Sequence, residues 1–99
     1  MTSAWEGASN LVDEKIQSFR QAPFDHLTKR PYRSELPDSN GEVGYTLYVD
    51  RLSQFSVRVV LQARELTRGG EPRVFAHGFD MQKNGDLSDI PANVLWEYC

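Results

Sequence analysis

The side chains of this protein that could carry out chemistry are few and scattered. Its two histidines, His26 and His77, lie far apart in the sequence, and each has an aspartate nearby, Asp25 and Asp80. A zinc site needs three or four converging ligands, usually with two of them at short spacing, and no such spacing occurs here. We therefore expect no metal site, and we expect both histidines to be structural or surface residues.

The segment from Asp80 to Pro91 places oxygen-bearing side chains at several positions of a calcium-binding loop. Pro91, however, stands where such a loop requires a bidentate glutamate, and a tight turn at Asn84 and Gly85 explains the same residues. The chain also lacks a nucleophile elbow and a phosphate-binding glycine loop. We expect no catalytic residue and no cofactor, and an enzymatic activity is kept only as an alternative.

Size and composition predict one globular domain spanning residues 1–99. Hydrophobic residues make up 39% and charged residues 25% of the chain, which is a normal balance for a folded domain. The net charge of −3 disfavours nucleic acid and anionic membranes as main partners. A single cysteine, Cys99, and no signal peptide or long apolar run predict a cytoplasmic protein that is not in a membrane.

Hydrophobic periodicity divides the chain into helical ends and a β-rich middle. Apolar residues at spacings of three and four, from Trp5 to Phe19, predict an amphipathic helix over residues 3–21, with Ser3 as its N-cap. At the other end, Pro91 suits the first turn of a short helix. The apolar side of that helix is expected to consist of Ile90, Val94, Leu95 and Tyr98.

Between these helices the apolar residues alternate with a period of two, which is typical of strands. Residues 32–36 are expected to form a short edge strand, followed by strands over residues 43–51, 55–64 and 73–79. A three-residue loop, 52–54, would place Val49 opposite Val57. The predicted fold is α+β: an N-terminal helix packed on a three- to four-stranded antiparallel β-meander, with a short C-terminal helix.

Gly69 and Gly70 suggest a two-residue hairpin turn, because glycine tolerates the positive φ that such turns need. This turn would place Arg68 opposite Glu71 and, further along the strands, Ala63 opposite Ala76. Small side chains would then face the N-terminal helix, and the bulky aromatic ones would stand on the opposite face of the sheet.

That register predicts a sheet face too apolar to be merely solvated. It could be covered by residues 22–37 or the C-terminal helix, serve as a protein interface, or stack nucleic-acid bases. The candidate binding residues on this face are Tyr48, Arg58, Gln62, Arg64, Phe75, His77 and Phe79.

The expected function is therefore that of a small, non-catalytic binding or regulatory protein that acts through a protein–protein surface. The partner could be a second copy in a homodimer, or a basic target protein inhibited by this acidic chain in the manner of an immunity protein. An alternative is a small-ligand-binding domain or an enzyme that uses a pocket between the sheet and the first helix. A nucleic-acid-binding sheet face agrees less well with the negative charge.

Overall fold

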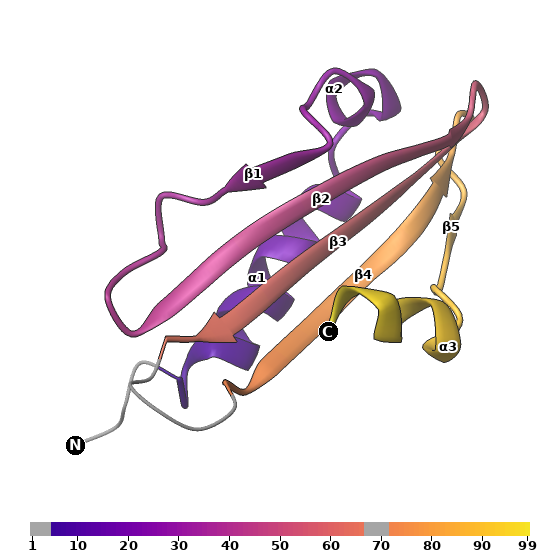
Figure 1. Ribbon diagram of the computed structural model, residues 1–99. Coiled ribbons are helices and arrows are strands. Elements are labelled where there is room, and N and C mark those ends of the chain that lie inside the picture. Colours follow the sequence, from indigo (N-terminus) through magenta and orange to yellow (C-terminus); the bar gives the residue numbers. More distant parts are fainter. Residues whose placement is uncertain (1–4, 67–71) are drawn as a thin grey trace.

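A computed structural model describes residues 5–66 and 72–99, which form an antiparallel sheet with helices on both faces (Figure 1). The predicted α+β fold is confirmed, with five strands. The helices are α1 (Ala8–Arg20), α2 (Phe24–Thr28), α3 (Ala92–Leu95) and the 3₁₀ turn η1 (Trp96–Tyr98). The strands are β1 (Arg33–Glu35), β2 (Val43–Ser53), β3 (Ser56–Glu65), β4 (Val74–Gln82) and β5 (Leu87–Ser88).

The sheet is a simple meander in which each strand pairs with the next along the chain, in the order β1-β2-β3-β4-β5. The predicted loop between β2 and β3 is wrong: Ser53 pairs with Ser56, so only two residues separate the strands, and Val49 lies opposite Val59 instead of Val57. This register differs from the predicted one by two positions. Because side chains alternate with a period of two, every β2 and β3 residue still lies on its expected face.

The face of the sheet that packs against α1, which we call the inner face, carries the main hydrophobic core. Helix α1 directs Ala8, Val12 and Ile16 into this core, and α2 adds Leu27. The spacing of these α1 residues is the one that the sequence pattern predicted, although the helix begins at Ala8 and the proposed cap Ser3 lies outside the described residues. The β2 and β3 residues of the inner face are Val43, Tyr45, Leu47, Val49, Val57, Val59, Leu61 and Ala63.

The predicted register between β3 and β4 is wrong by one residue. Ala63 lies opposite Phe75, where the expected partner was Ala76, and Val59 lies opposite Phe79. Because Arg64 lies opposite Val74, an odd number of residues separates these two positions along the chain. A two-residue turn at Gly69 and Gly70 requires an even number. The turn itself, with Arg68 and Glu71, lies outside the described residues.

A one-residue slip moves every β4 side chain to the other face. Phe79 is consequently fully buried in the inner core, and Phe75 packs against it with part of its ring exposed. Burying a phenylalanine ring removes far more apolar surface from water than burying alanine, so this register gives the larger hydrophobic gain. The local turn signal at Gly69 and Gly70 carried no information about that gain.

The opposite face of the sheet, which we call the outer face, is covered only in part. α3 and η1 cross it beside β4 and toward β3 (Figure 1). A smaller core forms there around Val60, Ala76 and Ile90. The partly buried residues that complete it are Tyr48, Val94, Leu95 and Tyr98, so the predicted apolar side of the C-terminal helix is confirmed.

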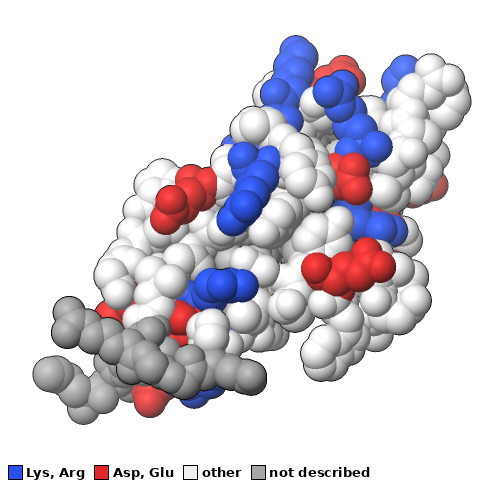
Figure 2. Space-filling view, viewed as in Figure 1, with Lys and Arg blue, Asp and Glu red and all other residues white. Residues whose placement is uncertain are grey.

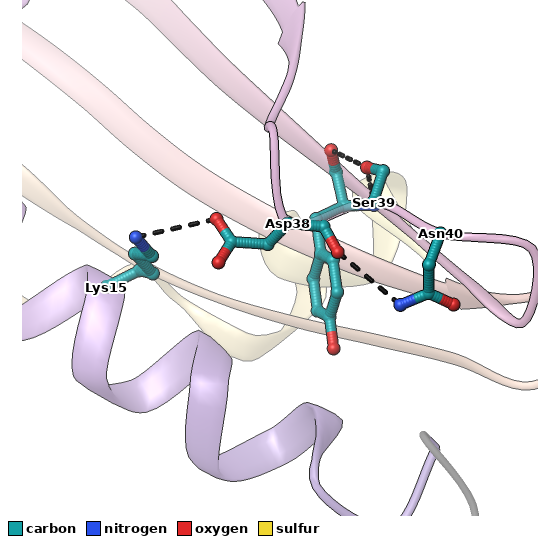
Figure 3. Close-up of polar contacts among 5 residues, drawn as sticks. Lys15, Asp38, Ser39 and Asn40 are labelled. Carbon is teal, nitrogen blue, oxygen red and sulfur yellow. Dashed lines mark hydrogen bonds and ion pairs between the residues drawn. The ribbon is translucent and has the colours of Figure 1, made fainter.

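The loop between β1 and β2 is tied to its surroundings by polar contacts (Figure 3). The Ser39 hydroxyl accepts a hydrogen bond from the Tyr45 amide at 2.9 Å, and the Asn40 Oδ1 accepts hydrogen bonds from the amides of Glu42 and Val43 at 2.7 and 3.0 Å. Asp38 forms an ion pair with Lys15 of α1 at 3.5 Å. The Asp38–Lys15 pair thus joins the loop to α1, and the Ser39 and Asn40 contacts join it to the start of β2.

Candidate functional site

The part of the outer face that α3 and η1 leave open forms a depression across β1, β2 and β3. Its volume is about 320 Å³, and its floor is β2 at Gly44, Thr46 and Tyr48. Strand β1 forms one wall and strand β3 the other. We call this depression the outer trough, and it is lined by Arg33, Glu35, Gly44, Thr46, Tyr48, Gln62, Arg64 and Leu66.

A second depression of about 380 Å³ continues from the outer trough toward η1. Tyr48, Gln62 and Arg64 line both, so the two are continuous. Its remaining lining residues are Tyr32, Asp50, Glu97, Tyr98 and Cys99. Figure 2 shows the outer face toward the viewer, with blue and red side chains separated by broad uncharged areas and without a large field of one sign.

Tyr48 is the centre of a cluster of rings at the junction of the two depressions. The Tyr98 ring meets it edge-on at a centroid distance of 5.3 Å, and Tyr32 does so at 6.0 Å. The Arg33 guanidinium lies 5.8 Å from the Tyr48 ring centroid, within range of a cation–π interaction. Burial, with a further contribution from Asp50, raises the pKa of Tyr98 above its ordinary value. The rings therefore give the trough a fixed, amphipathic centre.

Two predicted site residues, Arg58 and Gln62, lie on the outer face but are engaged in structural contacts. The Arg58 guanidinium donates two hydrogen bonds to Asp80 on β4, at 2.8 and 2.9 Å, and these bonds raise the pKa of Arg58. Gln62 donates a hydrogen bond to the main-chain carbonyl of Tyr98, which anchors η1 to β3. Both residues hold the outer face together.

Arg64, in contrast, is exposed, and no carboxylate of the described residues lies within 4 Å of its guanidinium. The structure therefore brings four of the predicted site residues, Tyr48, Arg58, Gln62 and Arg64, onto one face. Only Tyr48 and Arg64 expose groups to the trough without a structural hydrogen bond.

Phe75, His77 and Phe79 do not lie on this face, as a consequence of the β3–β4 register. Phe79 has no exposed surface. The Nδ1 of His77 lies 3.0 Å from the Asp13 carboxylate, a contact that links β4 to α1 at the rim of the inner face. The placement of these three residues beside Tyr48 was wrong, and the binding role given to the outer-face residues stays a prediction.

The sequence analysis missed Trp96 as a surface residue. Its side chain is 75% exposed, beside an apolar groove between α3 and the first residues of β4. It also missed Arg33 and Gly44. Gly44 carried a detectable signal, because glycine inside a strand is unfavourable and often marks a place where another group approaches the backbone.

The space between α1 and the sheet, where a ligand pocket was considered, is filled by side chains such as Val12, Ile16 and Phe79, all fully buried. Within residues 5–66 and 72–99 no group of three or more histidine, cysteine, aspartate or glutamate side chains is placed to hold a metal ion. Over the same residues, no helix has the length and apolar character to cross a bilayer.

Searches against protein-family models, curated proteins and solved structures found no match to this chain.

Proposed function

We propose that this protein is a non-catalytic binding protein whose contact surface for a protein partner is the open part of the outer face. The observation that carries the proposal is the outer trough, where Tyr48 and Arg64 are presented on a rigid sheet. Tyrosine and arginine are enriched at the centres of protein interfaces, because they combine a large contact area with directional polar groups.

The form of the trough also supports a protein partner more than a small molecule. Small-ligand sites bury most of the ligand in a largely apolar cavity, whereas this depression is open to solvent and lined mainly by charged and polar side chains. A protruding segment of another protein can fill such a surface and bring further contacts at its rim.

The test is affinity purification from the native cells, with partners identified by mass spectrometry and then rebuilt from purified proteins. Arg64→Glu should weaken binding of the purified partner by tenfold or more, measured by calorimetry. Lys29→Glu changes the charge equally at an exposed position on the last turn after α2 and should leave affinity unchanged. A partner that binds both variants as tightly as the wild type would contradict the proposal.

A homodimer is a second candidate, favoured by one observation of its own. The exposed Trp96 ring stands beside a groove lined by apolar residues of β4 and α3, among them Val74, Phe75 and Leu95. In a dimer with two-fold symmetry, the Trp96 ring of each copy could pack into the groove of the other copy. Light scattering over a hundredfold range of concentration should show a dimer that Trp96→Ser dissociates; a monomer at all concentrations would exclude this candidate.

A further inference from the structure

We infer that the outer trough binds an extended, acidic segment of the partner protein, with carboxylates of that segment bound by Arg33 and Arg64. The inference rests on the proposed function and adds the chemistry of the partner at that same site. It also reverses the expectation from net charge alone, which suggested a basic target.

The first argument is the charge balance of the trough. Arg33 on β1 and Arg64 on β3 stand on opposite walls, and neither has a carboxylate within 4 Å among the described residues. Elsewhere, Arg58 on β3 is paired with Asp80, and Arg73, just before β4, with Glu65, whereas Arg51 on β2 also has no carboxylate within 4 Å among the described residues. The trough itself contains one acidic side chain, Glu35, against two guanidinium groups, whereas Asp50 and Glu97 line the depression that continues from it toward η1. The excess of positive charge is therefore confined to the trough between β1 and β3.

The chemistry of arginine strengthens this argument. A guanidinium group is planar and presents paired N–H donors that match the two oxygens of a carboxylate. The Arg33 guanidinium lies over the Tyr48 ring, and this cation–π contact favours an orientation toward the trough before any ligand arrives. Less conformational entropy is lost on binding when a donor is already oriented.

The second argument is Gly44, which is independent of charge. Gly44 lies inside β2, opposite Arg64, and its φ is not in the left-handed region that would require glycine. A Cβ atom built there would meet only the Leu66 methyl groups, at 3.9 Å, which is ordinary van der Waals contact. Packing therefore gives no reason for glycine, whereas an incoming main chain lying on the floor of the trough would need the space.

The length of the floor indicates what can lie there. Gly44, Thr46 and Tyr48 span four residue steps of a strand, or roughly 13 Å at about 3.3 Å per residue. That length accommodates about four residues of an extended segment. Arg33 lies level with Tyr48 and Arg64 level with Gly44, four positions apart along β2, so acidic residues four positions apart in such a segment can lie beside the two guanidinium groups.

The probe for this inference is an acetylated, amidated octamer of glutamate, with a lysine octamer of the same design as its control. Amide chemical shifts of the isotope-labelled protein are followed by NMR during titration at low salt. We expect the glutamate octamer to shift the amides of Gly44, Thr46 and Arg64, and we expect 0.5 M salt to weaken binding, because exposed charges are screened.

Two variants locate the site. Arg33→Gln combined with Arg64→Gln should weaken binding of the glutamate octamer by about tenfold, because two exposed ion pairs are lost. Lys29→Gln combined with Arg51→Gln removes the same charge at exposed positions outside the trough and should change the affinity less than twofold. Gly44→Leu, which fills the floor without changing charge, should abolish binding while the protein remains folded.

Several results would overturn the inference: equal shifts with the lysine octamer, shifts spread over the other exposed cations, or wild-type affinity in Gly44→Leu.

Failure of the partner chemistry can be told apart from failure of the proposed function. If the glutamate octamer does not bind but Gly44→Leu still loses the cellular partner, the acidic chemistry is wrong and the binding face remains. If the partner is retained as well, both are wrong.

Discussion

The two faces of the sheet differ in how completely they are covered. The inner face lies under α1 and α2, and its β2 and β3 residues from Val43 to Ala63 are buried in one continuous core. The outer face has a small core only where α3 and η1 cross it, around Val60 and Ile90. Beyond that crossing, Tyr48 and Arg64 line an open depression. The same strands thus contribute to stability through one face and leave the other available for contact.

The glycines of the outer face show the same division within a single surface. Gly78 lies where Ile90 packs down, and a Cβ built there would approach the Val59 carbonyl oxygen to 2.1 Å and the Ile90 Cδ1 to 3.0 Å. Gly44, in the trough, has open space above it apart from Leu66. Packing requires glycine at position 78 but not at position 44. The two glycines thus mark the covered part of the outer face and its open part.

The largest effect is expected on the inner face. Phe79→Ala should lower the free energy of unfolding by about 3–5 kcal/mol, because the ring is fully buried between α1 and the sheet. Urea denaturation followed by circular dichroism measures it. Phe55→Ala is the matched control: that ring is 57% exposed in the β2–β3 turn, and its loss should cost about 0.5 kcal/mol or less. Equal losses in the two variants would contradict the assignment of the faces.

Gly78→Ala is expected to lower the free energy of unfolding by a smaller amount. The added methyl group must displace main-chain atoms of β3, because the Val59 carbonyl oxygen would lie 2.1 Å from it, and overpacking of this kind costs about 1–3 kcal/mol. The same denaturation experiment measures the loss. Increased hydrogen exchange in residues 90–98 would show that the C-terminal segment has also been displaced from the outer face. A variant as stable as the wild type would contradict the close approach of β3 and β4 at Gly78.

Gly44→Ala should change the free energy of unfolding in the opposite direction. Because the site has room and an ordinary strand conformation, alanine should raise the free energy of unfolding by about 0.5–1 kcal/mol. Denaturation midpoints of the two glycine variants, compared in one experiment, sharpen the contrast between the covered and open halves. A destabilised Gly44→Ala would mean that the floor of the trough is packed more tightly than its geometry indicates.

The smallest expected effect concerns tyrosine ionisation, with one tyrosine on each face. Burial, followed by the charge of Asp38, raises the pKa of Tyr45, and burial followed by Asp50 raises that of Tyr98. The unfolded-state value is 10.0, so this contribution to stability is complete below pH 10 and is lost as the pH rises through the folded-state pKa.

The free energy of unfolding should therefore decline above pH 10, and Tyr45→Phe and Tyr98→Phe should each reduce the decline. Unfolding curves between pH 8 and pH 11, together with tyrosinate absorbance, measure this. An undiminished decline in both variants would assign the alkaline loss to other groups.

Much of the fold was predictable because it depends on local periodicity. Alternation along β2 and β3 places the same residues inward in any register that keeps the period of two, so even a wrong loop length left the faces correct. The spacing of Val12 and Ile16 identified the buried side of α1 in the same way. The candidate site was predicted in part: Tyr48, Gln62 and Arg64 of the trough were found, whereas Arg33 and Gly44 were not.

The amino-acid sequence by itself therefore determined the order of the elements, the α+β class and the inward sides of α1, β2 and β3, because these depend on residues close together in the chain. Only the tertiary structure decided which way β4 faces, since the observed register buries Phe79 under α1. It also decided that the C-terminal segment covers half of the outer face and leaves the trough open. Both outcomes depend on contacts between residues distant in sequence, which no local pattern records.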